Sequence, residues 1–504
     1  MKIRLVFLTI MLLSPVFLRG QSRDADKPQF IEGYKVEGWY TTHDRSMLVT
    51  KSDQEMGFTF NNSGKQNPII VDPRQTYQEM VGFGFAMTGG SAGHLINMNA
   101  KARHDILEEM FGKGPGQARF SHIRLTIGAS DMNSFVFSYD DMPQGKTDFE
   151  LKNFTLSQDL NDVIPVMKEV LAINPDITIM ASPWSAPAWM KTAEDVRGGQ
   201  LRKECYDVYA RYFVKYIQAM AKQGIHISAV TVQNEPLNSR NTPSMYWFPY
   251  QQAEFVKNNL GPELRKAGLD TEILIFDHNC DRPDYPLAIL SDPEASKYVA
   301  GSAFHHYMGD MSSMTMVHNK RPDKDIYFTE QMTTERPGSP VIDIAPSVER
   351  LIVNVVRNWS RNVILWNLAN DPNNDPHTDN GGCSMCQGAI TIDGDMVTRN
   401  IAYYVIKQVS SLVPPGSVRI SSTAPFDPAY GFYEDEQAPN TWRMVPSAQS
   451  GVLPNVAFLT PDGKIVLVVV NNTASYSVTK VQYNGMYANL YVDAESVATF
   501  VWNR

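Results

Sequence analysis

Between about residues 76 and 411, short runs of apolar residues alternate with longer segments that repeat apolar residues at helical spacing. Runs rich in β-branched and aromatic residues are typical of buried strands, and the longer segments are typical of amphipathic helices. Helices are predicted over Asp159–Ala172, whose apolar stripe includes Leu160, and over Tyr206–Lys222. Eight strands are predicted here: Val81–Thr88, His122–Gly128, Ile177–Trp184, Ala229–Glu235, Ile273–Asn279, Ser302–Tyr307, Ile326–Gln331 and Val363–Ala369.

Eight strand–helix units in series predict an α/β fold, a (β/α)8 or TIM barrel, over residues 76–411. A doubly wound open sheet is the alternative, and such a sheet usually has a glycine-rich phosphate-binding turn after its first strand. The glycines of GFGFAMTGGSAG at residues 82–93 do not fit G-x-G-x-x-G with an acidic residue about twenty positions later. The pattern therefore favours the barrel.

After residue 412 the pattern changes to short strands joined by turns such as Pro461-Asp462-Gly463, which indicates a β-sandwich over residues 412–504. Within residues 21–75, the segment from about Phe30 to Val71 is also strand-like and rich in turns. We therefore expect both ends of the chain to form one side β-sandwich domain next to the barrel. The C-terminal strands are predicted at Val418–Ser422, Asn455–Leu459, Ile465–Asn471, Ser477–Gln482, Ala488–Val492 and Ser496–Trp502.

Residues 1–20 have the pattern of a secretory signal peptide: two early basic residues, an apolar stretch from Leu5 to Leu13, and a small residue, Gly20, at the end. The apolar stretch is too short to span a membrane, and no later segment has about 18 consecutive apolar residues. We therefore expect a protein without a membrane anchor that is secreted, periplasmic or at the cell surface.

The composition, 43% hydrophobic and 20% charged over 504 residues, is that of a globular protein. A formal net charge of −9 argues against nucleic-acid binding, because phosphate contacts need clustered Lys and Arg. Four cysteines are too few for a disulfide framework. Cys383 and Cys386 lack the second pair that a zinc ribbon needs, which favours a local disulfide or two free thiols over a zinc site. The sequence leaves the oligomeric state open.

Candidate chemistry lies where the predicted barrel strands end, because active sites of such barrels lie at the C-terminal ends of the strands. Glu235 ends the fourth strand and Glu330 ends the seventh, and strand ends that open on one mouth place two carboxylates near each other. The polar and aromatic residues at or near these ends are Arg124, Asp131, Trp184, Asn234, Glu235, Asp277, His278, His305, His306, Tyr307, Glu330, Trp366 and Asn367.

Two carboxylates on either side of a sugar ring cleave a glycosidic bond when one is held protonated and the other ionised. Arg124 is placed to favour the ionised form of Glu330. Asn234 suits a hydrogen bond to a sugar 2-hydroxyl, and Trp184 and Trp366 offer ring faces on which a pyranose can stack. The sequence thus predicts a glycosidase, and a structural ion pair is the weaker alternative for the two glutamates.

Six segments, in the family's order, resemble glycoside hydrolase family 30, which includes glucosylceramidases and microbial β-1,6-glucanases. They are GFGFAMTGGSA, RLTIGASDMNSFVFSYDD, ASPWSAPAWMKT, TVQNEP, FTEQ and SSLVPPGSVRI. The resemblance implies a barrel with a side β-sandwich, with Glu235 as general acid/base and Glu330 as nucleophile. It also implies that Asp131, Trp184, Asn234, Tyr307 and Trp366 line the glucose subsite. His305 matches a family histidine, with the adjacent His306 as the alternative because side chains alternate along a strand.

We therefore expect a retaining β-glycoside hydrolase that needs no cofactor or metal and acts through a two-glutamate double displacement. By resemblance the substrate is a β-1,6-glucan. The loop Asn370–Cys386, with its C-x-x-C, is similar to the microbial branch rather than to the lipid-cleaving animal enzymes. Alternatives are a glucosylceramidase or an exo-acting β-glucosidase, and more distantly a xylanase or a non-catalytic carbohydrate-binding protein. The sequence leaves endo or exo action open.

Overall fold

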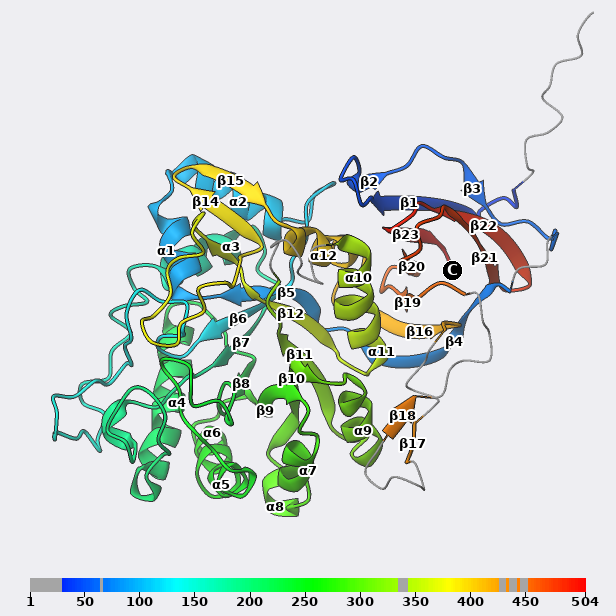
Figure 1. Cartoon of the computed structure of the whole chain (residues 1–504). Helices are drawn as coiled ribbons and strands as arrows, with labels where there is room; N and C mark the ends of the chain where they lie inside the picture. Colours follow the sequence, from blue (N-terminus) through cyan, green and yellow to red (C-terminus); the bar gives the residue numbers. More distant parts are fainter. Residues whose placement is uncertain (1–29, 64–66, 334–342, 426–431, 435–441, 445–451) are drawn as a thin grey trace, which may run out of the picture.

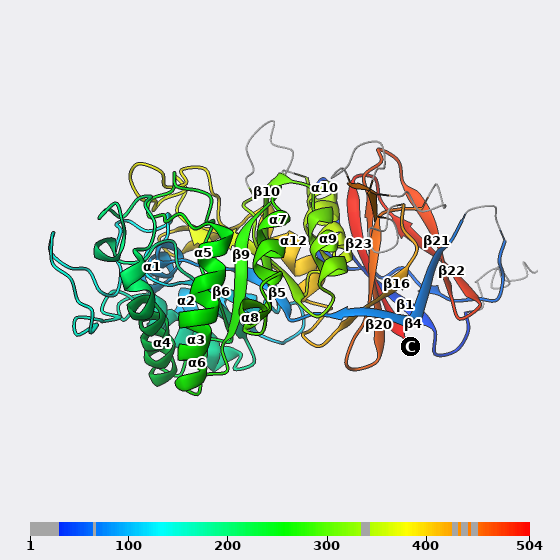
Figure 2. The same cartoon turned by 90° about the horizontal axis from the view of Figure 1, so that it is seen from below.

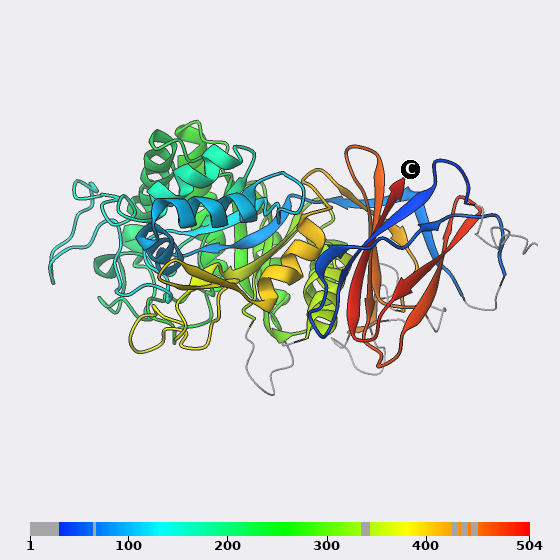
Figure 3. The same cartoon turned by 90° about the horizontal axis from the view of Figure 1, so that it is seen from above.

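The computed structural model describes residues 30–63, 67–333, 343–425, 432–434, 442–444 and 452–504. The chain forms a strand–helix barrel and a β-sandwich that lie side by side in all three views (Figures 1, 2 and 3). The predicted signal peptide lies outside the described residues. Among the helices that the structure describes, none is long and apolar enough to cross a membrane.

Eight parallel strands form the barrel, as the sequence pattern predicts. From the first to the seventh, each strand pairs with the next along the chain, and the eighth strand pairs with the first. The Arg361 backbone N–H donates to the Ile326 carbonyl at 2.9 Å, which brings the last two strands together and closes the barrel. The strands are β5 (Gly82–Met87), β6 (His122–Thr126), β7 (Thr178–Ser182), β8 (Ala229–Thr231), β9 (Glu272–Cys280), β10 (Val299–Gly309), β11 (Asp325–Glu330) and β12 (Asn362–Asn367).

The barrel helices follow the predicted alternation. They are α1 (Gly89–Asn97), α2 (Ala100–Phe111), α3 (Val163–Ile173), α4 (Tyr206–Lys222), α5 (Pro249–Phe255), α6 (Gly261–Lys266), α7 (Asp284–Leu290), α8 (Pro293–Ser296), α9 (Ser312–Lys320), α10 (Ile344–Val348), α11 (Val355–Arg357) and α12 (Ile401–Ser410). Two π-helical turns, Val256–Leu260 and Glu349–Asn354, join α5 to α6 and α10 to α11. Helix α4 has the predicted bounds.

Helix α3 begins later than predicted, at Val163 instead of Asp159. The Asp159 carboxylate accepts a hydrogen bond from the Tyr139 hydroxyl at 2.6 Å inside the protein, so the residues before α3 form turns. Leu160 is consequently 49% exposed and does not join the apolar stripe. The prediction for Leu160 was wrong because a buried tertiary contact overrides the helical period.

The sandwich combines strands from both ends of the chain in one ten-stranded sheet, as predicted. Strand β1 (Lys35–Thr41) pairs antiparallel with β23 (Ser496–Asn503), and β4 (Ile69–Glu79) pairs antiparallel with β16 (Val418–Ser422). The remaining strands are β2 (Leu48–Lys51), β3 (Met56–Gly57), β19 (Asn455–Leu459), β20 (Lys464–Asn471), β21 (Ser477–Tyr483) and β22 (Met486–Val492). Figure 3 shows the blue N-terminal strands lying among the red C-terminal ones.

Two smaller sheets complete the fold. Strands β13 (Ala369–Asn370), β14 (Ile390–Asp393) and β15 (Met396–Arg399) form one after the last barrel strand, and β17 (Phe432–Glu434) pairs with β18 (Trp442–Met444). Buried arginines join the barrel to the sandwich. Arg357 Nε donates to the Asn455 carbonyl at 2.6 Å, and Arg419 Nη1 donates to the Arg357 carbonyl at 2.7 Å.

Candidate active site

The two predicted glutamates lie together at the C-terminal mouth of the barrel. Glu330 is the last residue of β11, and Glu235 follows β8 in a segment that keeps strand-like hydrogen bonds to its neighbours. The Glu235 N–H donates to the Asp277 carbonyl at 3.0 Å, and the Asn234 N–H to the Pro183 carbonyl at 2.8 Å. Glu235 has a left-handed φ of +48°, a strained conformation that its surroundings must hold in place.

The separation of the two carboxylates fits a retaining mechanism. Oxygens of Glu235 and Glu330 and a ring nitrogen of His305 all lie within 4.8 Å of one another. Retaining glycosidases place their carboxyl groups about 5–5.5 Å apart, whereas inverting enzymes need about 6.5–9.5 Å to fit a water molecule. Both glutamates open onto a cavity of about 840 Å³. This cavity is large enough for a sugar, and its two acids are close enough for a direct attack on it.

Arg124, on β6, is completely buried and joins four groups beneath the cavity. Its Nη1 donates to Glu330 Oε2 at 2.6 Å, and its Nη2 donates to Asn234 Oδ1 at 2.7 Å and to Asp277 Oδ2 at 2.8 Å. Its Nε donates to Ser182 Oγ at 3.1 Å. The guanidinium therefore fixes the Glu330 carboxylate and the Asn234 amide in one rigid arrangement.

His305 lies between the two glutamates. Its Nδ1 is 3.2 Å from Glu235 Oε1 and 3.8 Å from Glu330 Oε1, and its Nε2 is 3.0 Å from Asp277 Oδ1. His305 is completely buried, whereas the adjacent His306 is only partly buried. Of the two histidines that the sequence left open, the structure thus places His305 in the site.

Asp277 is a site residue to which sequence reasoning gave no role. It is the extra residue of a β-bulge, because Phe276 pairs with Ala303 and His278 already pairs with Phe304. Bulges turn a side chain to a new direction, and this one brings the Asp277 carboxylate between Arg124 and His305. His278, whose Nε2 is 4.0 Å from Glu235 Oε1, was also not assigned. The sequence feature that could have identified Asp277 and His278 was their position at the end of a barrel strand.

His305 couples the ionisation of the two glutamates. Burial alone would raise the pKa of Glu235, but the hydrogen bond with His305 and the charge of His278 lower it to about 2. Burial would lower the pKa of His305, yet the charge of Glu330 and the contacts with Asp277 and Glu235 raise it to about 9. Burial and the charge of Glu235 keep the pKa of Glu330 above its ordinary value, although His305 and Arg124 oppose this. In the free protein, one proton thus lies on His305, a single hydrogen bond from Glu235.

Tyr307 and Asp131 line the cavity beside the glutamates. The Tyr307 hydroxyl donates to Glu330 Oε1 at 3.0 Å and accepts from the Met332 N–H at 3.0 Å. Burial and the charges of Glu330 and Glu235 hold the pKa of Asp131 well above its usual range. Asp131 Oδ1 is buried without a hydrogen-bond partner among the described residues, which suits it to a ligand hydroxyl.

The two tryptophans predicted to offer ring faces to a sugar, Trp184 and Trp366, stack on each other. Their ring centroids are 5.2 Å apart, and the Arg124 guanidinium lies 4.9 Å from the Trp184 ring. Trp366 lines the cavity, whereas Trp184 lies behind it and is 1% exposed. Trp184 Nε1 is buried without a partner among the described residues. His305 and Arg124, both completely buried, likewise lie behind the cavity wall, and Asn234 is 4% exposed.

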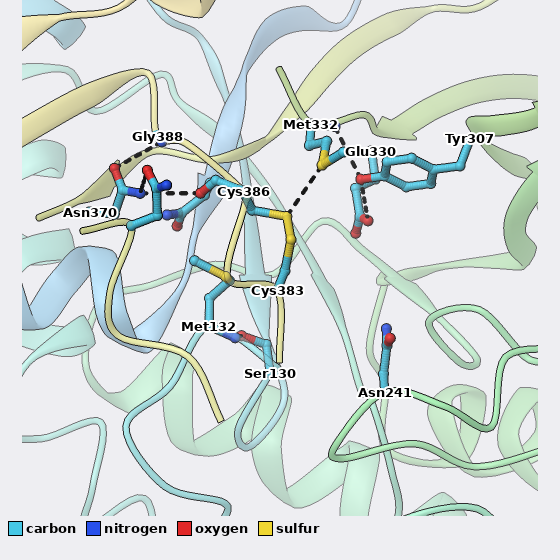
Figure 4. The surroundings of a disulfide bond; sticks show 12 residues. Ser130, Met132, Asn241, Tyr307, Glu330, Met332, Asn370, Cys383, Cys386 and Gly388 are labelled. Carbon is cyan, nitrogen blue, oxygen red and sulfur yellow. Dashed lines mark hydrogen bonds between the residues drawn. A yellow bond between two sulfur atoms is a disulfide. The ribbon is translucent and has the colours of Figure 1, made fainter. Parts of the chain in front are cut away.

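Cys383 and Cys386 form a disulfide, the first of the two alternatives left by the sequence, and both line the cavity. Figure 4 shows the disulfide facing Met332, with Glu330 and Tyr307 on the far side of that methionine. Nothing in the sequence pattern placed these cysteines in the site, because the loop that carries them has no regular period.

Glu235, His305 and Glu330 are also close enough together to hold a metal ion. The charge of the Arg124 guanidinium, 2.6 Å from Glu330, already balances that carboxylate, and His305 Nε2 is bonded to Asp277. The arrangement thus suits proton transfer between neighbouring groups better than metal binding. That the protein needs no cofactor or metal stays a prediction.

The fold and the paired carboxylates define a glycosidase of the retaining class, and comparisons with known proteins give the family. Residues 80–381 match the glycosyl hydrolase family 30 TIM-barrel domain, and residues 443–500 match the family 30 β-sandwich domain. The chain belongs to glycoside hydrolase family 30.

Three relatives show the range of this family. The endo-1,6-β-D-glucanase of Aspergillus fumigatus is 33% identical over 84% of this chain and 85% of its own length. The lysosomal acid glucosylceramidase of Mus musculus is 27% identical over 88% of this chain and 85% of its own. The solved structure of the endo-β1,6-glucanase BT3312 covers 93% of this chain and 99% of its own, with 33% identity and a TM-score of 0.81.

Proposed function

We propose that this enzyme hydrolyses β-1,6-linked glucan, with Glu330 as nucleophile and Glu235 as general acid/base. The observation that carries the proposal is the pair of carboxylates within 4.8 Å on one cavity, with Arg124 and Tyr307 both donating to Glu330. The similarity to two endo-β-1,6-glucanases at 33% identity supports the glucan linkage.

The reaction runs in two displacements. Glu330 attacks the anomeric carbon while Glu235 protonates the leaving oxygen, which gives a covalent glycosyl-enzyme. Glu235 then takes a proton from water, whose oxygen attacks the same carbon and releases Glu330. Arg124 and Tyr307 orient the attacking carboxylate through their hydrogen bonds at 2.6 and 3.0 Å.

The proton for the leaving group comes from His305. It lies on His305 in the free protein and passes to Glu235 along the 3.2 Å contact between Nδ1 and Oε1. The transfer removes both the charge of His305, which lowers the pKa of Glu330, and the charge of Glu235, which raises it. Arg124 and Tyr307 continue to donate to the Glu330 carboxylate. The proton transfer thus prepares Glu235 as the acid, and the hydrogen bonds from Arg124 and Tyr307 support the ionised form of Glu330.

The groups around the cavity suit a single glucose ring at the reacting end. Trp366 offers a ring at the wall, and Asp131 Oδ1 is a buried polar atom that a sugar hydroxyl would satisfy. Arg124 donates a hydrogen bond to the side-chain oxygen of Asn234. This contact orients the Asn234 amide for a hydrogen bond to the sugar 2-hydroxyl.

The outer part of the cavity favours a hydrated substrate over a lipid. Arg240, Asn241, Asp281 and Arg282 line it. Burying these groups under the two chains of a ceramide would remove their water without replacing it. A glucan chain can exchange hydrogen bonds with them, so glucan is preferred to glucosylceramide.

The test measures the rate of sugar release from four substrates: β-1,6-glucan, glucosylceramide, an aryl β-glucoside and glucuronoxylan. We expect β-1,6-glucan to give the highest kcat/KM and the aryl glucoside to be cleaved more slowly. Faster cleavage of glucosylceramide would replace the glucan proposal, and no glucose from any of the first three would overturn the glucose assignment.

We also propose that the enzyme is exported and that residues 1–20 are removed. Mass spectrometry of the protein recovered outside the cytoplasm tests this, and an intact N-terminus on the exported protein would contradict it.

A further inference from the structure

The Cys383–Cys386 disulfide joins two walls of the active-site cavity. Both cysteines line that cavity together with Asp131, Glu330 and Trp366. The two cysteines are three positions apart, so their disulfide closes a very short loop. Such a disulfide stabilises the folded protein little, because the effect on the unfolded chain grows with the size of the closed loop. Its position on the sugar site therefore calls for another explanation.

One end of this disulfide loop is anchored to the wall that carries Asp131. The Thr378 N–H donates to the Asp131 carbonyl at 2.9 Å, and the Gly382 N–H donates to the Thr378 carbonyl at 3.1 Å. At Gly382 a Cβ atom would come within 2.2 Å of the Thr378 carbonyl oxygen, so the chain passes too close for any side chain. Cys383 is therefore held on the Asp131 side.

The other end of the disulfide loop is anchored to the wall that carries Glu330. Asn370 Nδ2 donates to the Cys386 carbonyl at 3.2 Å, and Gln387 forms an antiparallel bridge with Thr333, three residues after Glu330. Cys386 Sγ lies 3.6 Å from Met332 Sδ. Figure 4 shows this sulfur contact directed toward Glu330 and Tyr307.

Met332 links the disulfide to the nucleophile. Its N–H donates to the Tyr307 hydroxyl at 3.0 Å, and that hydroxyl donates to Glu330 Oε1 at 3.0 Å. Movement of Met332 would therefore loosen a hydrogen bond that favours the ionised carboxylate. We propose that the Cys383–Cys386 disulfide is a positioning element of the sugar site, which fixes Asp131 on one wall and Met332, Tyr307 and Glu330 on the other.

The inference rests on the proposed role of Glu330, and its test starts with the oxidised and reduced enzyme. Dithiothreitol is oxidised to its cyclic disulfide while the two cysteine sulfurs take up two electrons and two protons. We expect reduction to lower kcat/KM on an aryl β-glucoside by about tenfold, since an active-site displacement of about 1 Å can cost about 10²-fold. We also expect the acidic limb of the pH profile to move to higher pH, because Glu330 loses support for its ionised form.

Three variants separate this role from mere stabilisation. Cys383→Ser/Cys386→Ser should reproduce the reduced enzyme and no longer respond to dithiothreitol. Met332→Ala keeps the disulfide and should shift the acidic limb in the same direction, with little further effect in the double-serine background. Cys205→Ser, which removes a buried thiol outside the cavity lining, should keep the wild-type response to reduction.

Complete reduction, verified by mass spectrometry, with unchanged kcat/KM and an unchanged acidic limb would overturn the proposal. A lower melting temperature with unchanged kinetics would overturn it as well. If reduction unfolds the protein, Met332→Ala decides by whether its acidic limb moves. If Glu330→Gln retains turnover, the proposed function fails; if that variant is inactive but reduction has no kinetic effect, only the role of the disulfide fails.

Discussion

The barrel mouth and the interface between barrel and sandwich each contain a buried arginine, but the two side chains have different partners. Arg124 at the mouth pairs with two carboxylates, at 2.6 Å to Glu330 and 2.8 Å to Asp277. Arg357 at the interface donates to the carbonyl oxygens of Asn455 and Ser422, at 2.6 and 2.7 Å. Arg124 thus pairs with side-chain carboxylates, whereas Arg357 binds backbone carbonyl oxygens.

The difference follows from what each region must do. A backbone carbonyl oxygen keeps the same partial charge at all times. Arg357 therefore only has to fix the positions of β19 and β16, which carry Asn455 and Ser422. In the proposed reaction, the charge of Glu330 disappears when it bonds to the sugar and returns when the sugar leaves, so Arg124 has to balance a charge that changes. We therefore expect damage at the mouth to appear as lost rate and damage at the interface as lost stability.

Glu330→Gln removes the changing charge and should have the largest effect. Loss of a catalytic nucleophile lowers kcat by roughly 10⁴-fold or more. Binding of sugar should largely persist, because glutamine keeps the size of the glutamate side chain. Turnover of an aryl β-glucoside and binding of a glucan oligosaccharide by calorimetry measure the two effects, and wild-type turnover would exclude Glu330 as nucleophile.

Glu235→Ala removes the proposed proton donor but leaves Arg124 and Glu330 in place. General acid catalysis contributes about 10²–10⁴-fold, and the loss should be greatest for natural glucan, whose leaving alcohol needs a proton. A substrate with a strongly acidic phenol as leaving group should lose much less in its first step. Equal losses on both substrates would contradict the acid role.

Arg124→Lys keeps the charge at the mouth but loses the planar fork that reaches four groups. We expect kcat to fall on the order of 10²–10³-fold, as for removal of one oriented donor. Steady-state kinetics measure this loss. A decrease of less than about tenfold would show that charge alone, without geometry, is sufficient.

Arg357→Lys is the matched change at the interface. Each lost hydrogen bond is worth about 1 kcal/mol, so the free energy of unfolding should fall by about 2 kcal/mol while kcat/KM stays within about twofold. Urea unfolding and the aryl glucoside assay give both numbers. A large loss of rate here would break the distinction between the two regions.

The smallest expected effect is the pH dependence of the mouth. The proton shared by His305 and Glu235 is lost as the pH rises through the His305 pKa of about 9, so kcat/KM should fall there. Because this folded pKa exceeds the ordinary 6.5, the contribution of His305 to stability is complete below about 6.5 and is lost as the pH rises to about 9. His305→Gln should move the basic limb of activity to lower pH.

Much of the site was predictable because a barrel strand ends at its active site. The apolar runs before Glu235 and Glu330 fix where their backbones leave the barrel, and this alone brought the two acids together. Asp277 was not predictable in the same way. It turns inward only because the β9–β10 pairing skips one residue, and a bulge has no marker in the hydrophobic pattern.

The sequence by itself determined the barrel, the sandwich shared by both chain ends, and the paired glutamates, because these follow from periodicity and strand order. The tertiary structure alone decided which histidine faces inward, where Trp184 lies, which partners each buried arginine takes, and that Cys383 and Cys386 line the sugar site. Those outcomes depend on contacts between residues far apart in the chain, which local patterns do not encode.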